Sequence, residues 1–106
     1  MQYSMKLLEK PFYEIKNGIK TIEFRLYDKK RKQLKIGDII EFSLLPDLNE
    51  KIKTEIVDLF QANTFKELFT KLELDNIDDK VNGMYKIYSP ENEKKFGVLG
   101  IKIKLI

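Results

Sequence analysis

The sequence contains no cysteine and no histidine, and these two absences exclude several classes of chemistry. Without cysteine the chain can form neither a disulfide bond nor a thiolate metal site. Without histidine it has no imidazole for acid–base catalysis and no His-based metal site. Any general base is therefore a carboxylate, a lysine or a tyrosine. We predict no metal ion and no cofactor.

Long apolar runs are also missing, since none approaches the roughly 20 residues that a membrane-spanning helix needs. The N-terminal segment Met1–Ser4 lacks the basic start and the apolar stretch of a signal peptide. We therefore expect a cytoplasmic protein with no membrane partner. With 106 residues, of which 42% are hydrophobic, the chain can build one core. We predict a single domain over residues 1–106.

The net charge of +3 is unevenly distributed along the chain. Residues 1–35 contain ten Lys or Arg and four Asp or Glu, whereas residues 36–106 contain ten and thirteen. A basic half indicates an anionic partner, and phosphate is the commonest. The simpler alternative is that the lysines only keep a small domain soluble.

Apolar periodicity and turn signals predict a chain that alternates strands and short helices. The expected strands are Tyr3–Leu8, Thr21–Leu26, Ile39–Leu45, Lys51–Phe60 and Val98–Ile106. The expected helices begin near Pro11, at the capping box of Thr64 and Glu67, at Asn76, and as a short turn after Ser89. The short connections between the second, third and fourth strands predict antiparallel pairing. The pattern indicates an α+β fold with a small, partly closed antiparallel β-barrel of about five to six strands and two to three flanking helices.

Apolar and polar residues alternate clearly in the second and last expected strands, and this predicts which face of each strand packs against the core. Ile22, Phe24 and Leu26 form the apolar face of the second strand, so we expect Glu23 and Arg25 to face outward. In the last strand we expect the core face to consist of Leu99, Ile101, Ile103 and Leu105.

The most informative stretch runs from Gly18 to Arg31, because it combines dense charge of both signs with an aromatic ring. Its charged members are Lys20, Glu23, Arg25, Asp28 and Arg31. Tyr27 offers a face on which a base can stack. The basic run Lys29–Lys32 is typical of a phosphate-contacting edge, although a solvated strand face followed by a solvated loop has the same composition.

Three smaller features remain open between a functional and a structural reading. Lys20 and Glu23 can activate a water as a pair, or can be a structural ion pair. Tyr85 and Tyr88 lie on an apolar helix stripe and fit a core, although a tyrosine at a helix end can reach a ligand. Asp75, Asp78 and Asp79 match no metal-loop spacing, and they suit the first turn of a helix.

Three segments together resemble the ASCH domain family of the PUA-like superfamily. They are the run Gly18–Arg25 (GIKTIEFR), the run Lys35–Phe42 (KIGDIIEF) and the ending from Tyr88 to Ile101. The similarity extends over nearly the whole chain and is closest to small stand-alone bacterial-type members. It implies a PUA-like β-barrel and RNA binding in a cleft beside this motif.

One bacterial branch of the family that the chain resembles hydrolyses N4-acetylcytidine with a lysine, a threonine and a glutamate. The lysine matches Lys20, but the threonine position is occupied by Glu23, and Thr21 stands two residues earlier. The glutamate falls in the region of Glu73 or Asp75. The resemblance therefore implies weak transfer of this activity.

We predict a module that binds RNA, or a nucleotide or nucleoside, in a basic cleft beside the strand Lys20–Arg25. The alternatives are a small hydrolase of a modified nucleoside or a ribonuclease with Lys20 and Glu23 as catalytic residues, and a protein-interaction domain. The predicted ligand contacts are Lys20, Thr21, Glu23, Arg25, Tyr27, Asp28, Arg31 and Tyr88.

Overall fold

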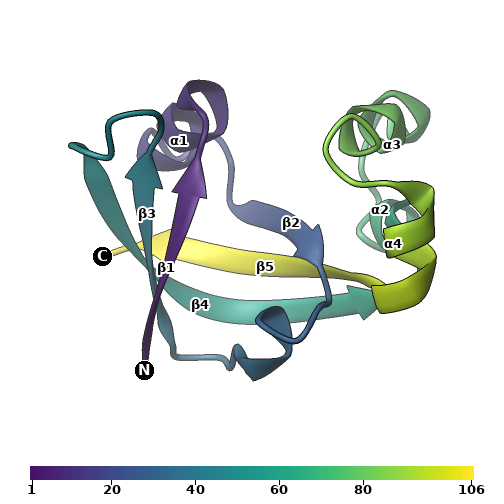
Figure 1. Ribbon diagram of the computed structural model, residues 1–106, viewed down its shortest axis with the longest axis horizontal. Coiled ribbons are helices and arrows are strands. Elements are labelled where there is room, and N and C mark those ends of the chain that lie inside the picture. The colour runs from purple at the N-terminus through teal and green to yellow at the C-terminus, as the bar shows by residue number, and fades with distance from the viewer. The chain divides into compact units, whose positions relative to one another are not determined.

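The computed structural model describes residues 1–106, which divide into two compact units. Unit 1 comprises Met1–Glu23, Lys35–Leu59 and Ile101–Ile106, and unit 2 comprises Phe24–Leu34 and Phe60–Gly100. The strands, labelled in Figure 1, are β1 (Gln2–Leu7), β2 (Ile22–Leu26), β3 (Ile39–Leu44), β4 (Lys51–Ala62) and β5 (Val98–Leu105). The helices are α1 (Glu9–Lys16), the 3-10 turn η1 (Arg31–Gln33), α2 (Phe65–Lys71), α3 (Ile77–Met84) and α4 (Pro90–Phe96). None of the helices is long and apolar enough to cross a membrane.

The five strands form one sheet in the order β1-β3-β4-β5-β2. β3 and β4 pair antiparallel, as expected, with Phe42 opposite Ile52. β1 and β3 pair parallel, with Tyr3 opposite Ile40, so the sheet is mixed rather than antiparallel throughout. The connection between β1 and β3 contains α1 and β2, which makes it long enough for a parallel pair. β2 neighbours β5 rather than β3, so the expected pairing of the second strand with the third is wrong.

In unit 1, α1 lies beside β1 and β3, as Figure 1 shows, and it contacts β3. Phe12 and Ile15 lie three residues apart and are both buried, so they form one face of the helix. Glu9 in the first turn and Lys16 in the last turn suit the helix dipole. The helix ends at Asn17, and Gly18 follows with a φ of 76°, a conformation that glycine adopts without steric cost.

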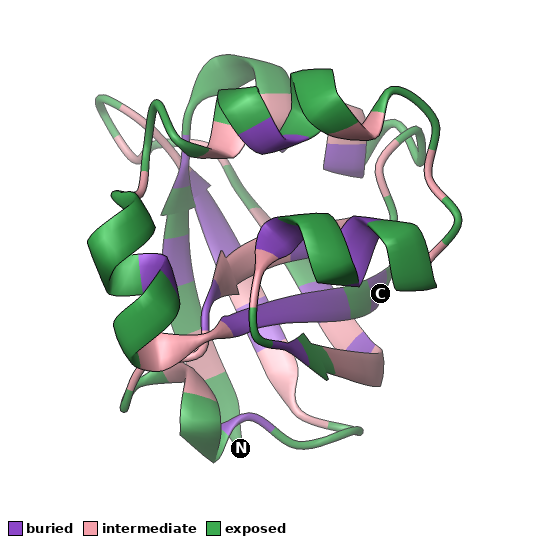
Figure 2. Ribbon diagram, turned by 90° about the vertical axis from the view of Figure 1, so that its right-hand side faces the viewer, coloured by how far each residue is buried: buried purple, intermediate pink, exposed green.

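In unit 2, α2, α3 and α4 surround a core that Figure 2 shows in purple. The buried residues of this core are Leu26, Ala62, Phe65, Leu68, Phe69, Val81 and Val98. Thr64 caps α2 by accepting a hydrogen bond from the backbone N–H of Glu67 at 3.1 Å, as the capping box predicted. Ser89 caps α4 through the N–H of Asn92 at 3.1 Å.

Three details of the helices and of the last strand differ from expectation. Four α-helices form instead of two to three, because the turn after Ser89 continues as the full helix α4. Asn76 stands at the N-cap of α3 in a left-handed conformation, and its side chain makes no cap hydrogen bond. Leu105 is 43% exposed although its alternation placed it in the core, since β5 loses its burial toward the end of the chain.

Candidate functional site

The Lys20–Glu23 pair lies in unit 1, where a tight turn after α1 leads into β2. The backbone N–H groups of Ile19 and Lys20 donate to the carbonyl of Glu14 at 2.8 and 3.0 Å, which fixes this turn. Lys20 Nζ lies 2.8 Å from Glu23 Oε1. Thr21 is exposed, and its carbonyl accepts a hydrogen bond from the N–H of Ile103 at 2.8 Å. The structure therefore brings Lys20 and Glu23 together, as the sequence predicted.

Glu23 is only 4% exposed, which overturns the expectation that it faces outward. The alternation of apolar and polar residues predicted that Glu23 lies on the solvent face of β2, because it takes no account of the stabilisation that the Lys20 ammonium gives to a buried carboxylate. An opposite charge at 2.8 Å compensates the loss of hydration that burial imposes. The apolar neighbours Ile22 and Phe24, which were expected to face the core, are only half-buried. A buried carboxylate held by an ammonium is an acceptor in a fixed position that can orient a polar group.

In unit 2, Asp28 and Arg31 form a second pair, just after the end of β2. Asp28 Oδ1 accepts the backbone N–H of Arg31 at 3.1 Å, and Asp28 Oδ2 accepts from Nη1 of the same arginine at 3.0 Å. The Asp28 carbonyl also accepts the N–H of Lys32 at 2.9 Å, so the aspartate organises the turn η1. The Nε atom of Arg31 is buried and has no hydrogen-bond partner. Asp28 therefore orients the guanidinium of Arg31.

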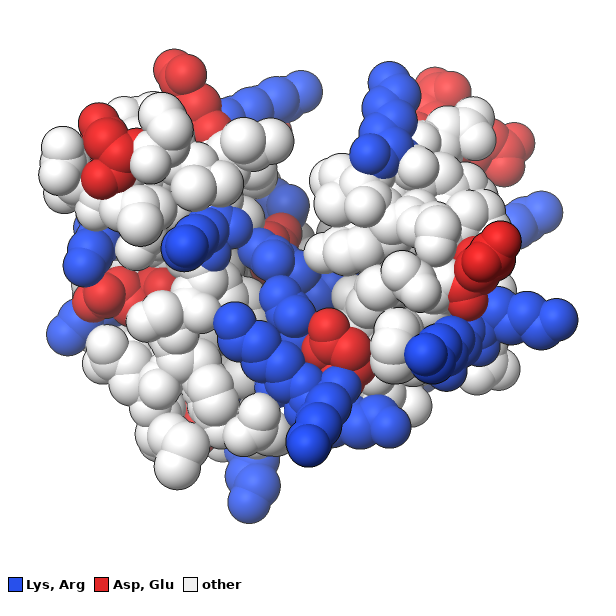
Figure 3. Space-filling model, in the orientation of Figure 1, with Lys and Arg blue, Asp and Glu red and all other residues white.

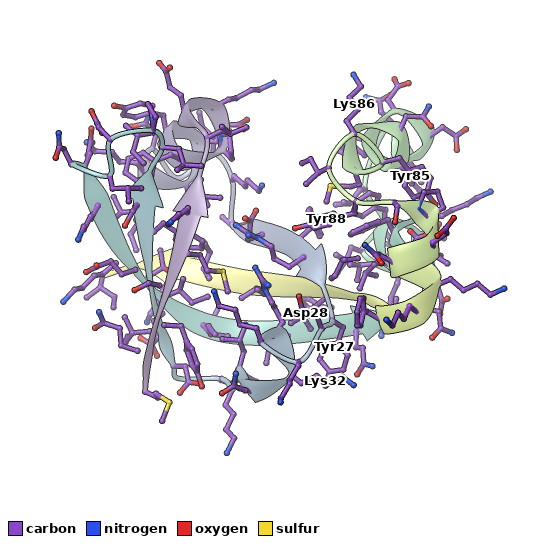
Figure 4. The ribbon with its side chains drawn as sticks, in the orientation of Figure 1. Tyr27, Asp28, Lys32, Tyr85, Lys86 and Tyr88 are labelled. Atoms are coloured by element: carbon purple, nitrogen blue, oxygen red, sulfur yellow. The ribbon has the colours of Figure 1, made fainter.

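An aromatic ring and three exposed lysines occupy the same turn. Lys32 Nζ lies 5.6 Å from the centroid of the Tyr27 ring, a cation–π distance. Lys29 and Lys30 are exposed. Figure 4 shows Tyr27, Asp28 and Lys32 together, and Figure 3 shows basic side chains gathered over this part of the surface. The surface of this turn is thus strongly positive.

Tyr88 follows α3 and packs its ring against the core of unit 2. Its ring stacks on Phe65 with a centroid distance of 5.9 Å, and its N–H donates to the Met84 carbonyl at 2.8 Å. The neighbouring Tyr85 donates its hydroxyl to Glu93 Oε1 at 2.8 Å, and this hydrogen bond raises the pKa of the phenol. Tyr85 is 38% exposed, so the expectation that its side chain is mainly core holds only in part.

Glu93 is a buried carboxylate that nothing in the sequence distinguished from the other acids of α4. It is 4% exposed, and its Oε2 accepts the backbone N–H of Phe65 at 2.9 Å. With Tyr85 on its other oxygen, it connects the starts of α2 and α4 to the end of α3. We assign it a structural role.

A third ionised cluster lies on the surface of unit 1 and contains none of the predicted site residues. Glu50 accepts hydrogen bonds from Lys16 Nζ and from the Tyr13 hydroxyl, the latter at 2.9 Å. The hydrogen bonds from Lys16 and then Tyr13 lower the pKa of Glu50. The same contacts raise the pKa of Tyr13 and of Lys16 through their hydrogen bonds to Glu50.

The remaining predicted residues lie on β2, between α2 and α3, and at the start of α3. Arg25 is half-buried on β2, and both Glu73 and Asp75 are exposed between α2 and α3. No group of three or more acidic side chains that could hold a metal ion comes together. Asp78 and Asp79 lie in the first turn of α3, where the helix dipole favours acids.

Comparison with known proteins decides the family. The sequence pattern of the ASCH domain matches residues 5–106, nearly the whole chain. The chain belongs to the ASCH domain family. A search of the curated proteins gives no match.

Solved structures share the fold of this ASCH chain. The crystal structure of hypothetical protein PH0355 is 35% identical with a TM-score of 0.87, over 100% of both chains. The solution structure of PF0455 from Pyrococcus furiosus is 34% identical with a TM-score of 0.76, over 100% of this chain and 98% of that one. A mutant of ZmASCH from Zymomonas mobilis is 13% identical with a TM-score of 0.61, covering 97% of this chain and 69% of that one, and it shows the fold alone. The α+β, PUA-like fold class predicted from the sequence is confirmed.

Proposed function

We propose that this ASCH chain binds RNA, or a nucleotide or nucleoside, through the second half of β2 and the turn that follows it. The observation that carries the proposal is the Tyr27 ring set among cations in unit 2. Aromatic rings beside lysine and arginine are what single-stranded nucleic acids bind, because bases stack and phosphates pair with the cations. Arg25, Arg31 and Tyr88 are the further contacts that we propose.

The positive charge of the segment that contains this turn supports a phosphate ligand. Residues 16–35 contain eight basic and two acidic side chains. The acids are Glu23, which is paired with Lys20, and Asp28, which is paired with Arg31. Their carboxylates are thus engaged by cations of the same segment, and the exposed lysines of the turn keep their positive field.

A salt titration with fluorescein-labelled single-stranded RNA tests the proposal. We expect binding at low salt and a linear fall of log K with log salt, because each phosphate contact releases counterions. Absence of binding at low salt would overturn it.

Substitution of Tyr27 separates stacking from charge. Tyr27→Leu should weaken binding about tenfold, as loss of one stacked base does, whereas Tyr27→Phe should keep the affinity. Both variants retain the backbone hydrogen bond from residue 27 to Gly97 and should remain folded. Equal affinities of the two variants would contradict a stacking role.

The second candidate function is hydrolysis of a modified nucleoside such as N4-acetylcytidine, and the Lys20–Glu23 pair favours it. A buried carboxylate 2.8 Å from an ammonium can hold a water for attack. We expect weak or no turnover, because the family's threonine is replaced by Glu23. Robust deacetylation that disappears in both Lys20→Ala and Glu23→Gln would rank hydrolysis above binding. The same samples, run on a gel with RNA, test for ribonuclease activity.

A further inference from the structure

The last turn of α4 lies directly beside the turn that follows β2, within unit 2. α4 ends at Gly97, whose N–H donates to the Glu93 carbonyl at 2.8 Å. The Gly97 carbonyl in turn accepts the N–H of Tyr27 at 3.0 Å. Lys94 and Lys95, in the last turn of α4, are therefore brought next to the proposed RNA contacts from a distant part of the sequence.

Each of the two segments places a lysine over an aromatic ring. Lys32 Nζ lies 5.6 Å from the Tyr27 centroid, and Lys95 Nζ lies 5.1 Å from the Phe96 centroid. Both lysines are exposed and both rings are half-buried. The rings hold the two ammonium groups at the surface without neutralising them. Figure 3 shows basic side chains over both the β2 turn and α4.

Two acids of these elements are engaged by other groups, and the exposed Glu91 lies in the first turn of α4, at the other end of the helix from Lys94 and Lys95. Asp28 uses both carboxylate oxygens on Arg31. Glu93 is buried and accepts from Phe65 and Tyr85. The lysine surface, as we name it, consists of Lys29, Lys30, Lys32, Lys94 and Lys95.

We propose that the ligand surface continues from the β2 turn onto the end of α4, and that its ligand is therefore an oligonucleotide strand rather than a single nucleotide. The inference rests on the proposed function, which leaves RNA, a nucleotide and a nucleoside open as ligands, and it selects RNA. A mononucleotide presents its phosphate at a single end. A strand presents a phosphate at every step, so it can contact lysines of both segments.

A second role for Lys94 and Lys95 is stabilisation of the C-terminal end of α4 by the helix dipole. The two roles differ in what they predict. A purely structural role alters the melting temperature and leaves the salt dependence of RNA binding unchanged. A ligand contact alters the salt dependence.

The test compares labelled single-stranded RNAs of about two and about twelve nucleotides, the first below and the second within the usual site size of about 4–16 nucleotides. For the longer RNA, Lys94→Ala/Lys95→Ala should lower the slope of log K against log salt by about 1.4, or 0.7 per lost phosphate contact. For the shorter RNA the slope should not change. Lys94→Arg/Lys95→Arg should keep the wild-type slope.

The matched control is Lys66→Ala/Lys71→Ala, which removes two exposed lysines from α2 and changes the net charge equally. An unchanged slope in the Lys94→Ala/Lys95→Ala variant, or an equal change in the control, overturns the inference and leaves the proposed function standing. Failure of the wild type to bind either RNA overturns the proposed function itself. A melting curve of each variant establishes that it is folded.

Discussion

Replacement of the buried Glu93 carboxylate by the neutral glutamine amide of the same size should strongly destabilise unit 2. In Glu93→Gln the amide oxygen can still accept from the Phe65 N–H, but the NH₂ group cannot accept from the Tyr85 hydroxyl and can only donate to its oxygen. Both charge-assisted hydrogen bonds are thereby replaced by neutral ones. A hydrogen bond to a charged group contributes about 1.5–3 kcal/mol, so we expect a loss of about 2–3 kcal/mol.

The partner substitution gives the second side of a double-mutant cycle. Tyr85→Phe removes one hydrogen bond at a position that is 38% exposed, and water can replace the lost donor there. We expect it to cost about 1 kcal/mol. The double variant should lose about 1 kcal/mol less than the sum, because the hydrogen bond between residues 85 and 93 is already weakened in Glu93→Gln.

Urea denaturation followed by circular dichroism measures these free energies of unfolding. Glu91→Gln is the matched control, since Glu91 is exposed in the first turn of the same helix and its replacement should change stability by less than about 0.5 kcal/mol. If Glu93→Gln is as mild as Glu91→Gln, the carboxylate does not connect the three helices as described. Strict additivity of the cycle would likewise refute the direct contact with Tyr85.

Three further predictions concern stability. Gly97→Ala should cost at least about 1 kcal/mol in the same urea assay, because φ is 75° and the new Cβ would lie 3.0 Å from a backbone oxygen; wild-type stability would contradict this. Phe24→Ala should cost about 3 kcal/mol, since the ring packs edge-on against Phe69 at 4.8 Å; a loss under about 1 kcal/mol would mean that the ring is dispensable. The hydrogen bond from Lys16 holds the pKa of Glu50 below its ordinary value of 4.5, so its stabilisation is present above that pH and is lost as the pH falls. Acid titrations of stability should be less steep for Glu50→Gln, and identical curves would contradict this.

Local signals in the sequence predicted most of the secondary structure. Thr64 and Ser89 begin helices because their hydroxyls accept backbone N–H groups three residues ahead, an interaction that spacing alone reveals. The apolar pair Phe12 and Ile15 likewise predicted α1. Asn76 shows the limit of such reasoning, because a preferred cap residue can adopt a left-handed backbone and make no cap bond.

Interactions between distant segments were not predictable. The sequence offers no sign that β1 pairs parallel with β3, since the hydrogen-bonding edge of a strand is not encoded in its alternation. Glu93 looks like the other acids of the chain, and it is buried because the Phe65 N–H and the Tyr85 hydroxyl, from distant parts of the sequence, meet it there. The Gly97–Tyr27 hydrogen bond brings Lys94 and Lys95 to the β2 turn, and no local pattern indicates it. The sequence therefore points to the segment that we propose as the site, but not to its neighbours in the fold.

The most direct test of RNA binding by the β2 turn is the affinity of Lys29→Ala/Lys30→Ala for single-stranded RNA at low salt. Both lysines are exposed, and the control Lys66→Ala/Lys71→Ala removes the same charge from α2. Our account predicts that the first variant binds about tenfold more weakly than the control while melting at the same temperature, as expected when phosphate contacts are lost. Equal affinities of the two variants would contradict it.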